Sequence, residues 1–515
     1  MNEPTPLGAV LKQSHGRPFA QFGGANPNNK PYFYGLETSM FYIGSPSIPS
    51  RGGVNRIVAR DPRNASRFVT IGKTVDAPDF PTAPVTFMEK RGGIPRHLVY
   101  DGCTITYYLV KGQCGDLSDM DRGWDSDVEI YSNGVVMEVT PSDRGSQDAD
   151  EILTTEITHT FESNYRVGML QLARRNDATI AAAVGDITYA PDSDCDGCIS
   201  ANNGSRVIYA VENGAAASKP VVWYSTDGGT TWGSASLAAS ANNDTVASVR
   251  VMGGNLVIVT RIGGGASTGA YFYAPINPRT GVPGTFVIVT TGFTASRQPN
   301  QMSVLGPNEA YIACDGGEIL KIDRVGGAVV SLGIIASGVN LTAIDASGAQ
   351  DMIVAGGAAG QVYRSYDRGR TFTAAAVVAA ASQVKAISIV DRVQIHLLSD
   401  KVYFTQDAGD AVWVTQLNVS GATMGDMVWA TPEVGYVGYI SGGSAIVACT
   451  LNGGYSWSAL GSRMASAIGG TPAITAINRL AVPITSNYNV AANFLAACGA
   501  CTADGFIATG GANVI

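Results

Sequence analysis

The sequence has little charge and very few histidines. Charged residues make up 15% of its 515 residues, against roughly 25% in typical soluble proteins. The 4 histidines lie far apart along the chain, which argues against HExxH-type zinc sites and leaves few general bases. The formal net charge of −8 argues against a broad basic face that binds nucleic acid.

Long apolar runs are also missing. No uninterrupted apolar segment reaches the roughly 18 residues that a membrane-spanning helix needs, so we expect no membrane insertion. The N-terminal segment MNEPTPLGAV lacks the basic start and apolar stretch of a secretory signal, so we expect no signal peptide.

Glycine, in contrast, is abundant, with 62 residues, well above the usual level of about 7%. Low charge with many glycines is typical of short strands joined by tight turns, because glycine adopts positive φ angles without steric cost. We therefore predict an all-β chain, and its length predicts about two to four domains.

A turn motif recurs in residues 176–515 with the pattern Ser-x-Asp-x-Gly-x-Thr-aromatic. Its copies comprise Ser225, Asp227, Gly229, Thr231 and Trp232; Ser365, Asp367, Gly369, Thr371 and Phe372; Asn452, Gly454 and Trp457; and a weaker set around Asp407 and Trp413. The pattern resembles the Asp box, or BNR repeat, of sialidase-like β-propellers. In such a turn the carboxylate accepts backbone N–H groups, glycine supplies a positive φ, and the aromatic packs beneath. We therefore assign these residues a structural role.

The spacing of these turns predicts the repeat unit. Asp367, Asp407 and Asn452 follow one another at about 40 to 45 residues, as expected of four-stranded propeller blades. Strand–turn–strand pairs recur at 179–188 with 205–212, 255–260 with 270–274, 309–314 with 318–323, 351–355 with 361–365, 393–398 with 401–405, 434–440 with 444–450, and 493–498 with 505–509. We predict a propeller of about seven blades, with six or eight as alternatives. A strand from residues 170–190 is expected to close the ring, because an open propeller leaves unpaired edges.

Residues 1–175 lack this repeat and are predicted to form a separate domain. Residues 1–100 carry many prolines and little periodicity, which indicates extended arms and loops. Strands are predicted at 104–110 and, with apolar and polar residues alternating apart from Ile152, at 151–162. The tripeptide Ser132-Asn133-Gly134 between two β-rich segments predicts a hairpin over 127–139.

Residues 107–162 resemble the tail tube proteins of long-tailed, siphovirus-type bacteriophages. The resemblance rests on Tyr-Leu-Val-Lys-Gly-Gln-Cys-Gly-Asp at 108–116, on Trp124 leading into 128–131, and on the acidic-polar loop near 143–151 with the Thr-rich strand after it. It implies a β-sandwich or barrel domain in hexameric rings that stack into a tube, with arms and loops locking ring to ring. It implies no catalytic residues.

The resemblance also implies a function and partners. The chain is expected to be the major tail tube subunit of a virion, assembled in the host cytoplasm, that conducts DNA during ejection. The expected partners are other copies of the chain, the tape measure protein and genomic DNA in the lumen, and other tail proteins at the tube ends. Because a domain of its size does not fit in the lumen, the propeller is expected on the outside of the tube, where its loops could contact host-surface glycans.

Acidic residues in the predicted strands are candidates for the lumen wall. They are Glu129, Glu138, Glu156 and Glu162. A negative wall repels the phosphate backbone, so that DNA slides through without sticking. The alternative is that these acids face neighbouring subunits.

One segment matches part of a calcium loop. Asp192, Asp194 and Asp196, followed by Gly197, fit the first half of such a loop, but Asn203 stands where the bidentate Glu belongs. A turn between propeller strands is therefore the favoured interpretation, with calcium as the alternative. Two CxxC pairs, Cys195/Cys198 and Cys498/Cys501, leave zinc, short disulfides and free thiols open.

Two other function classes use the same kind of propeller: a sialidase-like glycosidase and a carbohydrate-binding module. Glycosidases need paired carboxylates, yet residues 176–515 contain only Glu212, Glu309, Glu318 and Glu433 as glutamates. The Arg-Ile-Pro signature of sialidases is absent as well; Gly93-Ile94-Pro95 lacks the arginine. We therefore expect no enzymatic activity and no required cofactor.

Overall fold

The computed structural model describes the chain in segments: residues 17–22, 33–35, 54–61, 64–75, 82–88, 105–111, 127–141, 154–160, 163–167, 171–175, 183–190, 207–262 (except 216–217, 227–228, 230 and 238), 268–378 (except 349), 382–459, 474–482, 494–501 and 505–511. Nearly every element in them is a β-strand, and the helical segment η3 (Asp315–Gly317) is a single 3-10 turn. The predicted all-β class is confirmed. No helix in these segments is long or apolar enough to cross a membrane.

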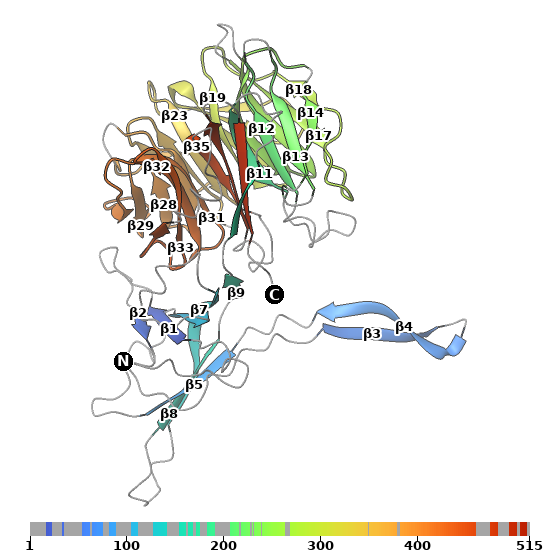
Figure 1. Cartoon of the computed structure of the whole chain (residues 1–515), viewed down its shortest axis with the longest axis vertical. Helices are drawn as coiled ribbons and strands as arrows, with labels where there is room; N and C mark the ends of the chain where they lie inside the picture. The colour runs from blue at the N-terminus through green and yellow to red at the C-terminus, as the bar shows by residue number, and fades with distance from the viewer. Residues whose placement is uncertain are drawn as a thin grey trace, which may run out of the picture. The chain divides into compact units, whose positions relative to one another are not determined.

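The described strands fall into two compact units, β1–β9 and β10–β37 (Figure 1). The strands of the first unit are β1 (Arg17–Phe22), β2 (Phe33–Gly35), β3 (Val54–Asp61), β4 (Asn64–Val75), β5 (Thr82–Met88), β6 (Ile105–Lys111), β7 (Asp127–Pro141), β8 (Thr154–Thr160) and β9 (Ser163–Val167). One sheet has the order β2-β1-β6-β7-β8-β5, with β9 pairing β7, while β3 and β4 form a separate antiparallel pair.

The hairpin predicted over 127–139 is wrong, because β7 runs unbroken through Ser132, Asn133 and Gly134. The first half of β7 pairs with β6 on one edge and β9 on the other, and its second half pairs with β8. These long-range ladders satisfy backbone groups that a local turn would leave for solvent. Pairing with three other strands therefore outweighs the turn preference of the tripeptide.

Strand β8 has the alternation predicted for 151–162. Ile157 and His159 are buried, whereas Glu156 is exposed and Thr158 and Thr160 are half-buried. The strand is shorter than predicted, and β9 follows it directly along the chain. One face of this part of the sheet is therefore apolar and the other is polar.

The second unit contains a β-propeller, in which six sheets each consist of four consecutive antiparallel strands. The first three sheets comprise β11 (Val184–Tyr189), β12 (Ile208–Glu212), β13 (Val221–Ser225) and β14 (Gly233–Ser236); β15 (Thr245–Met252), β16 (Asn255–Ile262), β17 (Thr268–Pro275) and β18 (Val287–Val289); and β19 (Pro299–Gly306), β20 (Glu309–Cys314), β21 (Glu318–Ile322) and β22 (Val330–Ile334). The next three comprise β23 (Leu341–Ser347), β24 (Met352–Gly357), β25 (Val362–Ser365) and β26 (Thr373–Ala374); β27 (Ala386–Ile389), β28 (Ile395–Leu398), β29 (Val402–Thr405) and β30 (Val414–Leu417); and β31 (Thr423–Trp429), β32 (Gly435–Ser441), β33 (Ser444–Thr450) and β34 (Ser458–Ala459).

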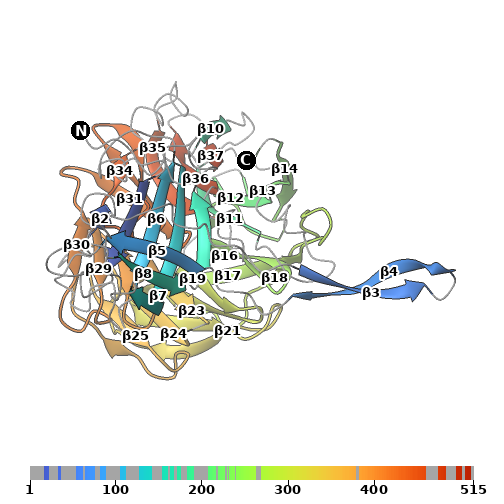
Figure 2. The same ribbon diagram turned by 90° about the horizontal axis from the view of Figure 1, so that it is seen from below.

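These blades follow one another in chain order. The first strands of successive blades contact each other, and in Figure 2 the colours run round the ring from green through yellow to orange and red. Each of the predicted strand–turn–strand pairs overlaps two neighbouring strands of one sheet. Those sequence predictions are confirmed.

A further four-stranded sheet joins the two ends of the second unit. It has the order β10-β37-β36-β35 and combines β10 (Gln171–Arg175) with β35 (Ile474–Ala481), β36 (Phe494–Cys501) and β37 (Gly505–Gly511). Strand β35 contacts both β31 and β11. The predicted pairing of a strand from residues 170–190 with the C-terminal strands is confirmed. It also places β10 in the second unit, although the predicted boundary at residue 175 would leave it in the first.

The propeller core lies between neighbouring sheets and is rich in buried tyrosines. The largest fully buried side chains are Tyr209, Tyr271, Tyr311, Tyr436 and Phe272. The Tyr209 hydroxyl donates to the Gly281 carbonyl at 2.6 Å, so its polar end is satisfied while the ring packs. The first strands of the sheets carry the candidate site at their beginnings.

Candidate functional site

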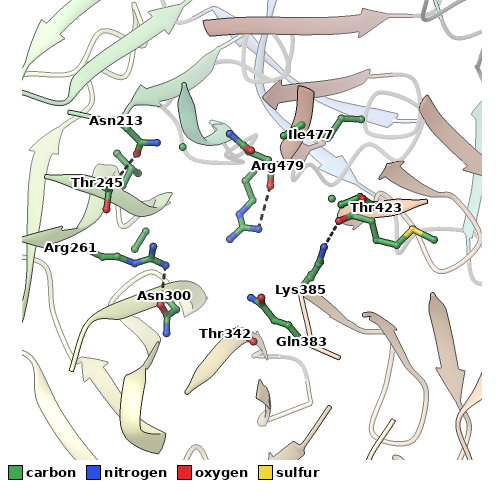
Figure 3. Close-up of a pocket in the computed structure, with 17 residues that line it drawn as sticks. Asn213, Thr245, Arg261, Asn300, Thr342, Gln383, Lys385, Thr423, Ile477 and Arg479 are labelled. Atoms are coloured by element: carbon green, nitrogen blue, oxygen red, sulfur yellow. Dashed lines mark hydrogen bonds between the residues drawn. The ribbon is translucent and has the colours of Figure 1, made fainter. Parts of the chain in front are cut away.

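A cavity of about 520 Å³ opens where the first strands of the sheets begin (Figure 3). This volume is within the roughly 300–1,000 Å³ typical of small-molecule sites. Every sheet of the second unit contributes to the 17 described lining residues. They are Gly185, Asn213, Thr245, Val246, Ala247, Arg261, Asn300, Thr342, Gln383, Lys385, Thr423, Met424, Gly425, Ala476, Ile477, Asn478 and Arg479. We call this cavity the mouth.

Three cationic side chains reach the mouth from three different sheets. Arg261 lies near the end of β16, Lys385 directly precedes β27, and Arg479 lies in β35. Figure 3 shows Arg261 and Arg479 pointing into the same open space, with Lys385 and Gln383 across it. The fold thus gathers positive charge that is dispersed in the sequence.

Hydrogen bonds hold Arg261 and Lys385 in place. Arg261 donates from Nε to the Pro299 carbonyl at 2.8 Å and from Nη2 to Asn300 Oδ1 at 2.9 Å. Lys385 donates from Nζ to the Met424 carbonyl. These acceptors are uncharged, so they orient both side chains without neutralising them.

Burial partly desolvates the same two cations. Burial lowers the pKa of Arg261; the Asp315 carboxylate opposes this shift and the Arg479 cation adds to it. Burial also lowers the pKa of Lys385. A negative charge in the mouth would favour the charged form of both side chains.

Arg479 lies between two buried carboxylates. Its Nε is 3.7 Å from Asp186 Oδ1, and its Nη1 is 3.8 Å from Asp426 Oδ1. Asp186 also pairs with Arg250 Nη1 at 2.9 Å. Burial raises the pKa of Asp426, an effect that the Arg479 cation opposes. Arg479 therefore presents charge to the mouth and also links β35 to β11 and β31.

Four hydrogen bonds of polar side chains in the mouth join neighbouring sheets. The side chains bond to the backbone of a neighbouring sheet, which fixes the rim of the cavity. The bonds are Val246 N to Asn213 Oδ1 (2.8 Å), Asn300 Nδ2 to the Leu341 carbonyl (2.7 Å), Thr342 Oγ1 to the Val384 carbonyl (2.6 Å) and Asn478 Nδ2 to the Val184 carbonyl (2.7 Å). The rim is accordingly preorganised before any ligand arrives.

The described lining of the mouth contains neither an acidic nor an aromatic residue. Glycoside hydrolysis needs a pair of carboxylates, and the mouth offers none. Without aromatic rings, a ligand is held by charge and hydrogen bonds rather than by stacking. The described arrangement is therefore suited to binding an anion.

A second cavity, of about 490 Å³, lies toward the other ends of the first strands. It contains the carboxylates of Asp345 and Asp426, both of which accept backbone N–H groups of a neighbouring sheet: Ile389 N at 2.9 Å and Leu480 N at 2.8 Å. Burial raises the pKa of Asp345. These carboxylates hold adjacent sheets together, and that structural use accounts for their burial.

The predicted turn residues adopt a common geometry. A hydroxyl at the first position accepts the N–H of the glycine, from Gly229 to Ser225 Oγ (2.7 Å), Gly369 to Ser365 Oγ (2.8 Å), Gly409 to Thr405 Oγ1 (3.0 Å) and Gly454 to Thr450 Oγ1 (3.0 Å). Asp367 accepts both the N–H and the hydroxyl of Thr371, and Asn452 accepts the N–H of Ser456. The glycines have φ angles between 78° and 87°. Asp227 lies outside the described residues.

The aromatic residues pack beneath these turns as predicted. The indole N–H of Trp232 donates to the Gly229 carbonyl, and that of Trp457 donates to the Gly454 carbonyl, both at 3.1 Å. Phe372 packs against the core between two sheets. These contacts give the described turn residues a structural use; that structure is their only role remains a prediction.

The structure describes three of the four predicted lumen residues. Glu138 and Glu156 are exposed and lie on one face of the β7–β8 ladder, because Glu138 is opposite Thr158 and Thr140 is opposite Glu156. Glu129 is opposite Leu109 and Arg166 in the first half of β7. Glu162 lies outside the described residues.

The candidate calcium residues Asp192, Asp194 and Asp196 lie outside the description, as do Cys195 and Cys198. Within the described residues, no group of three His, Cys, Asp or Glu side chains is placed to hold a metal ion. Cys314 and Cys449 are free and buried. Cys498 and Cys501 belong to β36.

Sequence reasoning missed the cations of the mouth. Arg261, Lys385 and Arg479 lie far apart in the sequence, and none belongs to a motif. Their common feature is position, since Lys385 and Arg479 belong to first strands or their immediate starts. Comparing equivalent positions in the first strands of the predicted blades would have identified Lys385 and Arg479. It would not have identified Arg261, which lies on a second strand.

Comparison with known proteins yields fold likeness alone. The chain matches no protein-family model and no curated protein. Its propeller is similar to YCF48 from Cyanidioschyzon merolae, with 13% identity and a TM-score of 0.46 over 66% of this chain and 98% of that chain. It is also similar to a structure of YCF48 bound to D1 peptide, with 12% identity and a TM-score of 0.44 over 66% of this chain and 94% of that chain. The similarity to U3-55K has 10% identity and a TM-score of 0.46 over 66% of this chain and 98% of that chain. Likeness at this level carries no argument about ligands or activity.

Proposed function

We propose that the chain is a structural subunit of a phage tail tube, which assembles through its first unit and displays the propeller on its outside. The proposal begins from the sequence resemblance of residues 107–162 to tail tube proteins. Its main structural support is the exposed face that carries Glu138 and Glu156 together. A wall of such faces around a channel would repel DNA phosphates.

The propeller is proposed as a self-contained module of seven blades. Support comes from the sheet β10-β37-β36-β35, which has the four strands of a blade and contacts the neighbours expected of one. Pairing of β10 with β37 covers an edge that would otherwise remain open. If the propeller is closed by strands of its own chain, assembly of the tube can take place through the sheet of the first unit.

We further propose that the propeller belongs to the Asp-box class and binds host-surface glycans without cleaving them. The described turn geometry supports the first part, and the polar mouth without a carboxylate pair supports the second. A glycosidase would need an acid and a base or nucleophile in the mouth. The described lining has neither.

The channel proposal is tested by reversing the charge of the shared face. Tubes carrying Glu138→Lys and Glu156→Lys should sediment with added double-stranded DNA at low salt, whereas wild-type tubes should not. A matched control, Asp323→Lys, changes an exposed acid on the propeller. If the control retains DNA as well as the double variant does, the acids of β7 and β8 do not line the channel.

A further inference from the structure

Two of the three cations of the mouth, Arg261 and Lys385, form no ion pair among the described residues. Among the described residues, no carboxylate lies within ion-pair distance of Arg261 or Lys385, while Arg479 has contacts of 3.7 and 3.8 Å with carboxylates beneath it. Both Arg261 and Lys385 are half-buried. Partly buried cations are costly unless an anion accompanies them, so an anion in the cavity would stabilise the charged forms of Arg261 and Lys385.

We propose that the mouth binds the oxyanion of an acidic sugar, through Arg261, Lys385 and Arg479. This inference rests on the proposed glycan-binding function and names its ligand class. The three side chains come from sheets on different sides of the cavity (Figure 3). An anion in the centre can therefore accept charge-assisted hydrogen bonds from more than one direction.

The remaining lining favours a sugar as the carrier of that charge. Gln383 and Thr423 are exposed at the rim, and Thr342 Oγ1, which donates to the Val384 carbonyl, can still accept a hydrogen bond. Such groups match the hydroxyls of a saccharide, which donate and accept hydrogen bonds. The absence of aromatic side chains in the described lining disfavours a neutral sugar, because charge is then the strongest available contact.

The size of the cavity argues against nucleic acid as the ligand. About 520 Å³ accommodates a small-molecule group rather than a duplex. Broad recognition of nucleic acid also relies on an extended basic surface, and the chain has a net charge of −8. A single acidic sugar unit or a short segment of an acidic polysaccharide fits better.

The test is a calorimetric titration of the full chain with three probes: trigalacturonate for a carboxylate, a sulfated disaccharide for a sulfate, and maltotriose for a neutral sugar. We expect binding of one or both acidic probes and none of maltotriose. Lys385→Gln should weaken acidic-probe binding by about 10- to 100-fold, the loss expected for one charge-assisted hydrogen bond, while Lys385→Arg should retain most of it.

Two controls separate the site from general charge and from folding. Arg279→Gln removes an exposed cation elsewhere on the propeller and should leave binding unchanged. Lys385→Gln should keep the wild-type circular dichroism spectrum, because its described side-chain bond is a single one to a carbonyl. The carboxylate and sulfate arms identify which oxyanion is preferred.

Several outcomes would overturn the inference. They are no binding of either acidic probe, equal binding of maltotriose, equal loss in Arg279→Gln, or preferential binding of a single-stranded oligonucleotide that Lys385→Gln abolishes. The titration does not depend on tube formation. Failure of the acidic-sugar site and failure of the tail tube proposal are therefore distinguishable.

Discussion

Arg479 Nε lies 3.7 Å from Asp186 Oδ1, across the junction between the sheet that contains β35 and the first propeller sheet. The two residues are 293 positions apart in numbering, yet Asp186 is also the acceptor for Val249 N at 2.7 Å and Arg250 Nη1 at 2.9 Å. One buried carboxylate therefore connects three consecutive sheets. We expect the junction between these sheets to depend on this carboxylate.

Removing the Asp186 carboxylate is expected to destabilise the propeller strongly. Asp186→Ala removes the acceptor of the Val249 N–H and a carboxylate partner of Arg250 and Arg479, and loss of one partner from a buried charge network costs about 3–5 kcal/mol. Asp186→Asn keeps an oxygen for Val249 N and should cost less. Urea unfolding measures both variants; equal effects would show that the acceptor geometry at Asp186 is unimportant.

The contribution of β10 can be measured by truncation. A fragment of residues 168–515 retains β10, whereas a fragment of residues 176–515 leaves the edge of β37 unpaired. We expect the longer fragment to be monomeric with the higher melting temperature and the shorter one to aggregate, because exposed strand edges pair with other chains. Equal melting temperature and solubility would contradict the proposed closure.

His396 is expected to make stability depend on pH. Its ring stacks on Trp429 and Phe404 at centroid distances of 3.8 and 4.6 Å. Burial lowers its pKa from 6.5 to about 3. In the unfolded chain the His396 ring binds a proton near pH 6.5, whereas in the folded chain it does so only near pH 3. The contribution of the neutral ring to the free energy of unfolding is therefore complete above pH 6.5 and is lost as the pH falls toward 3.

The measurement for His396 is the free energy of unfolding at several pH values in that window. His396→Gln cannot take up the proton, so its stability should fall less steeply between pH 6.5 and 3. The absolute stability of the variant at pH 7 is expected to be lower, since the stacked ring is lost. A slope identical to that of the wild type would show that His396 is not the group responsible.

The turn residues should differ in importance according to their burial. Asn452 is 3% exposed and its side chain bonds to Thr450 and Ser456, so Asn452→Ala should cost about 1–3 kcal/mol. Asp367→Ala should cost less, because its carboxylate is at the surface. Thermal unfolding ranks the two variants, and a larger loss for Asp367→Ala would contradict this ranking.

Asp367 also provides a second pH effect, below that of His396. The hydroxyl and N–H of Thr371, with the Ser365 hydroxyl, lower its pKa from 3.8 to about 2. The stabilisation is present above pH 3.8 and is lost as the pH falls toward 2. Asp367→Asn should flatten the stability curve in that range only, and a change confined to higher pH would contradict the assignment.

Features set by local sequence could be predicted well. The turns were predictable because Ser365, Asp367 and Gly369 satisfy one another within a few residues. The strand pairs were predictable because tight turns separate apolar segments. No tight turn connects β37 to its distant partner, so that partner was predicted only as the region 170–190 and not as the strand Gln171–Arg175.

Features set by distant parts of the chain could not be predicted. The turn signal at Asn133 and Gly134 is local, but β6, β8 and β9 each pair with β7 and keep it extended. The mouth shows the same limit, because its charge comes from Arg261, Lys385 and Arg479 on separate sheets. Only the arrangement of the sheets around a common centre brings them together.

Negative-stain electron microscopy of the purified full-length chain shows whether it assembles into tubes. We expect rings with sixfold symmetry and stacked tubes, with globular projections along the outside that are absent when residues 168–515 are removed. A population of monomers under all conditions, or tubes whose wall is built from the propellers, would contradict this expectation.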